Sequence, residues 1–191
     1  MRYFSFIILL LLSFSCTSVS QEKGDTVKVV SDTTISNAND SLLPHRITLL
    51  FAGDLMQHQG QINAARTPAG YDYSDCFKFV KEEISRADIA IANLEVTLGG
   101  KPYRGYPAFS APDEYLSAIR EAGFNVLITA NNHCLDRGKK GLERTILMLD
   151  SLRIPYAGTY TNAETREQRY PLMIEKNGFR TVSYTHLRAH E

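Results

Sequence analysis

Three short apolar runs, each followed by polar residues, constrain the fold of this chain more than any other feature. The runs are ITLLFA at 47–52, DIAIA at 88–92 and NVLITA at 125–130. Continuous apolar runs of this length are typical of strands that are buried on both faces, as in a parallel sheet. The polar residues that follow are Gly53-Asp54, Asn93-Leu94-Glu95 and Asn131-Asn132-His133. We therefore expect buried strands whose carboxyl ends carry polar side chains.

Helical patterns fill the intervals between and after these runs. Apolar residues recur at helical spacing in residues 75–87, 110–123 and 138–152. We expect Ser110 to cap the second helix and Pro112 to lie in its first turn. Strands and helices alternate along the chain, which predicts an α/β fold with a mainly parallel, buried sheet and flanking helices.

A hairpin is predicted after the last of these helices. Asn177-Gly178 lies between two apolar runs, at 170–175 and 179–181. Asn-Gly in this position is a strong signal for a two-residue turn between antiparallel strands.

The polar residues at the strand ends have the chemistry of a metal site. Open α/β sheets bind ligands at the carboxyl edge, because the following loops converge there. Carboxylate, amide and imidazole groups suit divalent Mg, Mn, Zn or Fe. The candidate ligands are Asp54, Glu95, Asn132 and His133. Each also has an ordinary structural explanation as a helix cap, a turn residue or a loop residue, but three such groups in one domain favour a site.

These motifs resemble those of a known family. Gly53-Asp54-Leu55-Met56, Asn93-Leu94-Glu95 and the segment from Ala130 to Asp136 are similar to signatures of the bacterial capsule-synthesis CapA proteins, also called the poly-γ-glutamate synthesis or PGA_cap family. The resemblance extends from about Ile47 to Arg180. It implies a calcineurin-like metallophosphoesterase fold, here truncated.

The resemblance also implies roles for individual residues. Asp54 matches the first metal-ligand aspartate, and Glu95 stands where phosphoesterases carry a metal-bridging aspartate. Asn132 would bind metal, and His133 would stabilise or protonate a leaving group. The implied cofactor is one or two divalent ions of Mn, Zn, Fe or Mg.

Three further residues are candidates for this site. Phosphoesterases of this fold usually carry a histidine two residues after the first aspartate, where this chain has Met56, so His58 is the nearest substitute. Asn93 belongs to the second motif. Asp136 is expected near His133, where a carboxylate can orient the ring through its N–H.

The amino-terminal segment predicts export. Residues 1–16 combine a basic residue, an apolar run and small residues before Cys16, as in a secretory signal that resembles a bacterial lipoprotein box. Acylation of Cys16 would anchor the chain to a membrane; the alternative is an ordinary cleaved signal. Residues 17–46 are polar without apolar periodicity, which predicts a disordered tether. Residues 47–181 then form the amino-terminal part of the metallophosphatase-like domain.

The last ten residues, 182–191, resemble a translated sequencing adapter. We therefore exclude His186 and His190 from the candidate ligands. The alternative is a natural polar terminus. If the tail interrupts the chain, the site lacks later ligands, and we expect this piece to be inactive.

The composition narrows the remaining choices. The chain has 21 basic and 21 acidic residues, which argues against nucleic acid as a partner. Cys76 and Cys134 could form a disulfide in an exported protein or remain as buried thiols.

We expect a cell-envelope lipoprotein that serves capsule or poly-γ-glutamate biosynthesis or export. Its partners would be an anionic capsule polymer, the membrane through a lipid anchor, and a membrane-bound synthesis complex. The alternatives are a metal-dependent hydrolase acting on a phosphoester, and a non-catalytic protein that binds polymer.

Overall fold

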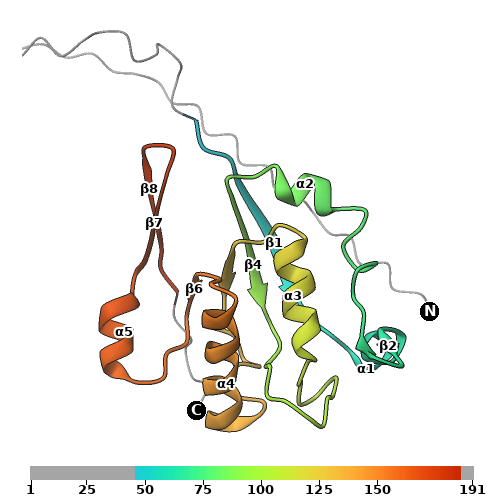
Figure 1. The fold of residues 1–191 in the computed structure, drawn as a ribbon. Coiled ribbons are helices and arrows are strands. Elements are labelled where there is room, and N and C mark those ends of the chain that lie inside the picture. Colours follow the sequence, from blue (N-terminus) through green and yellow to red (C-terminus); the bar gives the residue numbers. More distant parts are fainter. Residues whose placement is uncertain (1–45, 186–191) are drawn as a thin grey trace, which may run out of the picture. The chain divides into compact units, whose positions relative to one another are not determined.

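The computed structural model describes residues 46–185 (Figure 1). The predicted signal segment with Cys16, most of the tether, and the last six residues of the predicted tail lie outside this range. The elements in chain order are β1 (Leu49–Leu55), α1 (Gln59–Ala64), β2 (Arg66–Thr67), β3 (Gly70–Tyr71), α2 (Lys81–Ser85), β4 (Ile89–Leu94), α3 (Asp113–Glu121), β5 (Val126–Ile128), α4 (Gly138–Ser151), β6 (Tyr156–Ala157), α5 (Ala163–Arg169), β7 (Leu172–Lys176) and β8 (Phe179–Ser183).

The central sheet has four strands in the order β1-β4-β5-β6. All three pairings are parallel, and the helices α3 and α4 connect strands that are neighbours in the sheet. The predicted α/β fold with a parallel sheet and flanking helices is confirmed. It is consistent with the truncated metallophosphoesterase-like fold that the resemblance implies.

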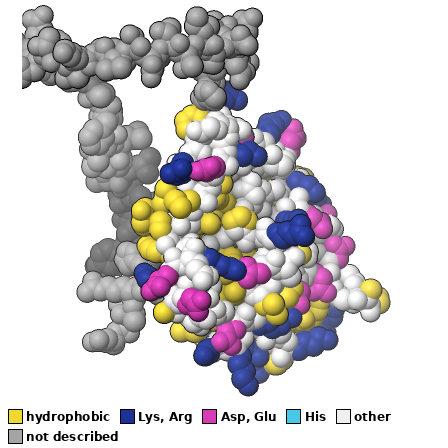
Figure 2. Space-filling view, turned by 60° about the vertical axis from the view of Figure 1, so that its left-hand side comes forward, with side chains coloured by type: hydrophobic (Ala, Val, Ile, Leu, Met, Phe, Trp, Pro, Cys, Tyr) yellow, Lys and Arg dark blue, Asp and Glu magenta, His cyan; other side chains and the backbone are white. Residues whose placement is uncertain are grey.

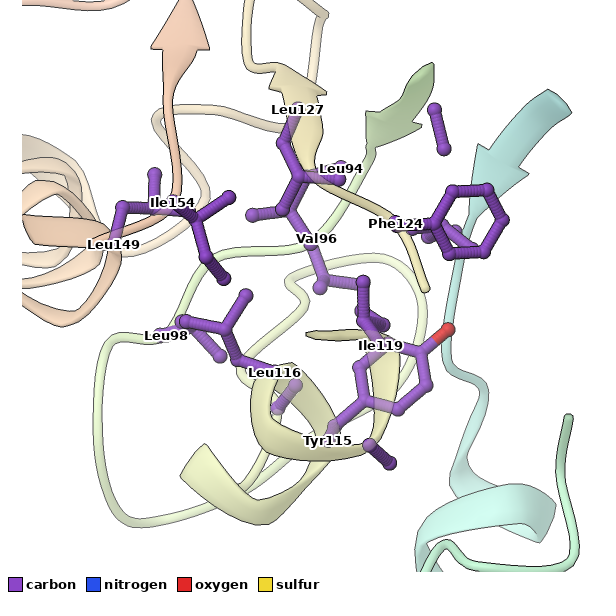
Figure 3. Close-up of a cluster of buried hydrophobic side chains, with 14 of the residues drawn as sticks. Leu94, Val96, Leu98, Tyr115, Leu116, Ile119, Phe124, Leu127, Leu149 and Ile154 are labelled. Atoms are coloured by element: carbon purple, nitrogen blue, oxygen red, sulfur yellow. The ribbon is translucent and has the colours of Figure 1, made fainter. Parts of the chain in front are cut away.

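The main core lies between one face of this sheet and the helices α3 and α4 (Figure 3). Leu116 and Ile119 of α3 and Leu149 of α4 are fully buried there. They meet Leu94 at the end of β4 and Leu127 of β5 in a single apolar cluster. The periodic apolar residues of the two predicted helices therefore form the buried stripe, as helical spacing requires.

The strand β1 differs from its prediction because most of it is exposed. Phe51 is 71% exposed, whereas β4 is mostly buried. β1 is an edge strand with β4 as its neighbour in the sheet. An apolar groove of about 350 Å³ lies on the sheet face opposite the helices, lined by Ile89 and Ile91 of β4, by Phe51 and by the hairpin β7–β8. Figure 2 shows hydrophobic side chains gathered on part of the surface.

Two helix predictions were wrong in their boundaries. In the predicted helix 75–87, the helical part is α2 (Lys81–Ser85), and turns precede it. Ser110 does not cap α3; Pro112 occupies the N-cap position, and the Ser110 hydroxyl donates to the Gly100 carbonyl at 2.7 Å. Ser110 is fully buried in a loop, so tertiary contacts outweighed its capping preference.

The predicted hairpin is present as β7–β8. Asn177 and Gly178 both have positive φ, at 52° and 80°, as a two-residue hairpin turn of this type requires. β8 extends to Ser183, so the first two residues of the predicted tail are paired with β7. The origin of the tail stays a prediction.

The two cysteines of the described region are free thiols. Cys76 is exposed and Cys134 is half-buried, so they neither form a disulfide nor share the buried environment expected of them. Within residues 46–185, none of the helices has the length and apolar character needed to cross a bilayer.

Candidate functional site

The register of β1 on β4 brings the first two polar motifs together. Asp54 lies within β1 rather than after it, and it pairs with Asn93 across an irregularity that begins at Phe51. The Asn93 amide donates to Asp54 Oδ1 at 2.9 Å and to Glu95 Oε2 at 2.8 Å. Side chains two residues apart on a strand share one side, so Asn93 and Glu95 both lie beside Asp54.

The two carboxylates form a like-charge pair. Burial raises the pKa of Glu95 above its ordinary value, and the neighbouring Asp54 carboxylate raises it further. His133 and the Asn93 amide act in the opposite direction and favour the ionised form. The pair therefore attracts positive charge, whether a proton or a cation.

Asn131 connects these strand ends to the third motif. It is 8% exposed. Its amide nitrogen donates to Asn93 Oδ1 at 3.0 Å and to the Leu94 carbonyl at 2.9 Å. Its Oδ1 accepts from the His133 backbone N–H at 3.1 Å. Asn131 thus fixes the loop after β5 against the end of β4.

Asn132, the predicted ligand of this pair, is exposed, and within the described residues its side chain forms no hydrogen bond. The sequence analysis did not identify Asn131 as a residue of the site. In the structure Thr129, Asn131 and His133 are buried, whereas Asn132 is exposed. Asn131 lies in a bend and residues 132–137 form turns, so strand periodicity does not distinguish the two asparagines in the sequence.

His133 is held by a carboxylate on the same loop. Its Nδ1 lies 2.9 Å from Asp136 Oδ2, and both side chains are 11% exposed. The same carboxylate oxygen accepts from the Phe109 backbone N–H at 2.8 Å. Because an ionised carboxylate only accepts hydrogen bonds, Nδ1 carries the proton and Nε2 remains free for chemistry.

Aromatic rings enclose this histidine. The Phe109 ring lies edge-on to His133 with centroids 4.7 Å apart, and Tyr106 lies 6.4 Å from it. His58 contacts the same two aromatic rings, at 5.4 Å from Phe109 and 6.4 Å from Tyr106. The structure therefore places His58 in the aromatic wall beside His133, at the start of α1. Tyr106 and Phe109 lie within the region of family resemblance, but the sequence analysis did not select them as site residues.

Comparison with known proteins identifies the family. The family model described as "Bacterial capsule synthesis protein PGA_cap" matches residues 48–190. The chain belongs to this family.

Two relatives of this PGA_cap family member illustrate the similarity. Capsule biosynthesis protein CapA of Bacillus anthracis is 29% identical over 123 residues, which cover 61% of this chain and 29% of that protein. An uncharacterized protein, y4sH, of Sinorhizobium fredii (strain NBRC 101917 / NGR234) is 31% identical over 125 residues, covering 61% of this chain and 26% of that protein. The chain thus spans less than a third of the length of these relatives.

The candidate site of this PGA_cap family member offers hard oxygen donors, but too few of them to surround a metal ion. Asp54 and Glu95 supply carboxylates, and the amides of Asn93 and Asn131 lie beside them. Within residues 46–185, no three His, Cys, Asp or Glu side chains are grouped closely enough to hold a metal ion together. These residues therefore match a cation in charge and donor type, but not in coordination number.

Proposed function

We propose that this protein serves the biosynthesis or export of an anionic capsule polymer, such as poly-γ-glutamate, at the cell envelope. The observation that carries the proposal is the family match over residues 48–190. The relative from Bacillus anthracis that bears a capsule-biosynthesis name supports it. The polar network at the sheet edge is where we place the activity.

The same site is proposed to bind a divalent ion of Mn, Zn, Fe or Mg. Asp54 and Glu95 would contribute carboxylate oxygens, and Asn132 and His133 are the other two proposed ligands. A bound ion would supply Lewis-acid polarisation and a more acidic water. Within the described chain, Asn93 would orient both carboxylates through its two hydrogen bonds.

A metal-dependent hydrolase acting on a phosphoester or related bond is the second candidate. The observation that favours it is the His133–Asp136 pair. Asp136 fixes the ring through Nδ1, which leaves Nε2 as the atom that would exchange a proton with a leaving group. Phe109 and Tyr106 lie edge-on to the same imidazole and would help to position it.

A strain lacking the gene tests the capsule role. It is complemented with the wild-type chain, Asp54→Asn, His133→Asn, or Asp75→Asn as a control at an exposed carboxylate outside the network. Polymer on the cells is measured at matched protein levels. We expect the wild type and the control to restore polymer and the two site variants to fail.

The possible outcomes separate the candidate functions. Normal polymer in the deletion strain refutes the capsule role. Full complementation by both site variants leaves only a non-catalytic polymer-binding role. Hydrolysis of a phosphodiester such as bis(p-nitrophenyl) phosphate that is lost in His133→Asn supports the second candidate, and equal hydrolysis by wild type and variant eliminates it.

Lipid anchoring through Cys16 is proposed from the sequence and lies outside the described residues. Cys16→Ala should move the protein from the detergent phase to the aqueous phase. Cys76→Ala is the matched control, because Cys76 is an exposed free thiol within the fold. Unchanged partitioning of Cys16→Ala refutes the anchor. If the anchor holds, a membrane-bound synthesis complex is the proposed partner.

A further inference from the structure

A second concave surface lies beside the candidate site. It has a volume of about 650 Å³ and is lined by Ile62, Arg66, Tyr71, Lys101, Pro102 and Tyr103. We call it the tyrosine pocket. Its volume falls within the range of about 300–1,000 Å³ that is usual for ligand sites. None of these residues belongs to the three sequence motifs.

Two cations of the tyrosine pocket have no acidic partner. Arg66 and Lys101 are exposed, and neither forms an ion pair or a side-chain hydrogen bond with any residue from 46 to 185. Asp113 is neutralised by Arg144 through two hydrogen bonds of 2.8 and 2.7 Å. The Glu114 carboxylate lies beside Gly70 of β3. The cations therefore exceed the free acidic groups, and an anion would find unpaired positive charge.

Two tyrosines add a surface for hydrogen bonding and packing. The Tyr71 and Tyr103 rings meet edge to face with centroids 5.3 Å apart. Burial, followed by the carboxylates of Asp113 and Glu114, raises the pKa of Tyr103. Its phenol therefore stays neutral at physiological pH and can donate a hydrogen bond to an anion.

Two hydrogen bonds to backbone carbonyls hold the loop that carries Lys101 and Tyr103. Arg137 donates to the Pro102 carbonyl at 2.9 Å, and the Ser110 hydroxyl donates to the Gly100 carbonyl at 2.7 Å. A pocket that is already in place loses less conformational entropy when it binds a ligand.

Two chain segments connect the pocket to the candidate site. The loop from Lys101 leads to Tyr106 and Phe109, which enclose His133. Helix α1 begins beside His58 and leads to Ile62 in the pocket. The two segments touch where the Gly105 N–H donates to Gln59 Oε1 at 3.3 Å. A long ligand in the pocket would therefore extend toward His133.

We infer that the tyrosine pocket binds a carboxylate-rich stretch of a polymer chain whose adjoining part lies at the His133 site. This inference rests on the proposed function and assigns the polymer a place on the surface. Arg66 and Lys101 pair with successive carboxylates, and the two tyrosines pack against the chain between them. A neutral polysaccharide would use the tyrosines but leave both cations unpaired.

The test measures binding of fluorescently labelled poly-γ-glutamate to the full chain by anisotropy. The test variant is Arg66→Gln/Lys101→Gln. The control is Lys81→Gln/Arg120→Gln, which removes the same charge from α2 and the far end of α3. We expect the test variant to bind about tenfold more weakly or worse, and the control to bind as the wild type does. Circular dichroism checks that both variants are folded.

Further measurements make the result decisive. Raising the salt concentration from about 0.05 to about 0.5 M should weaken polymer binding by the wild type, because salt screens the attraction between the cations of the pocket and the carboxylates of the polymer. Tyr103→Leu should weaken binding without changing the salt dependence. Equal affinity of wild type and Arg66→Gln/Lys101→Gln overturns the inference, and so does an equal loss in the control, which indicates non-specific charge attraction.

The failure of this inference is distinguishable from failure of the proposed function. If the wild type binds the polymer and the pocket variant is unaffected, the pocket is wrong while the polymer role stands. If labelled dextran binds and poly-γ-glutamate does not, two claims are refuted: that the pocket binds carboxylates and that the polymer is anionic. The complementation experiment still decides whether the protein has a role in capsule formation.

Discussion

Replacing Asn131 with alanine should destabilise the fold far more than the same change at its neighbour Asn132. Asn131 is 8% exposed and makes three hydrogen bonds, to Asn93, to the Leu94 carbonyl and from the His133 N–H. Alanine at this position leaves these three polar groups without their partner, two of them on the backbone. A buried polar group left unpaired costs about 1–3 kcal/mol.

The expected loss for Asn131→Ala is therefore about 2–4 kcal/mol of unfolding free energy, allowing for partial access of water to one group. Asn132→Ala should change stability by no more than about 0.5 kcal/mol, because its side chain is exposed. Urea unfolding, followed by circular dichroism, measures the stability of both variants. For Asn131→Ala we expect a lower urea midpoint and an unchanged dependence of the unfolding free energy on urea concentration.

A third variant separates the donor and acceptor roles of this residue. Asn131→Asp keeps an oxygen that accepts from the His133 N–H but cannot donate to Asn93 or Leu94. It also adds negative charge close to Asp54 and Glu95. We expect it to be destabilised at pH 7 and to recover partly in acid. Equal stability of Asn131→Ala and Asn132→Ala would refute the reasoning.

Two further predictions test the electrostatics of the fold. Because burial and Asp54 raise the pKa of Glu95, the folded state holds that proton more tightly than the unfolded chain, so ionisation above the ordinary value of 4.5 destabilises it. Glu95→Gln should then be more stable than the wild type at pH 7 in EDTA, with a difference that vanishes in acid; a constant difference at all pH values would contradict this. Arg144 binds both oxygens of Asp113, a geometry that lysine cannot reproduce, so Arg144→Lys should lose about 1–2 kcal/mol in thermal or urea unfolding. Arg120→Lys, at an exposed position, is its control and should unfold as the wild type does.

The local elements of this fold were predictable because their signals are local. The apolar runs specified β4 and β5, the 3.6-residue spacing specified α3 and α4, and Asn177-Gly178 specified the turn of the hairpin. The motif residues Asp54, Glu95 and His133 could be placed in one region, because parallel strands carry their carboxyl ends to one edge. Family membership also followed from these motifs and was confirmed.

Tertiary structure alone decided how these pieces meet. The register of β1 on β4 set Asp54 opposite Asn93, and the position of β1 at the sheet edge left Phe51 exposed although its run is apolar. Strand order depends on which distant segments pair, whereas the residue pattern within one strand specifies only which of its faces is buried. The selection of Asn131 over Asn132, and the meeting of β3 and α1 with the loop at Lys101 in one pocket, arise from the same long-range contacts. The sequence determined which residues were available for a site, and the packing of distant segments determined which of them touch.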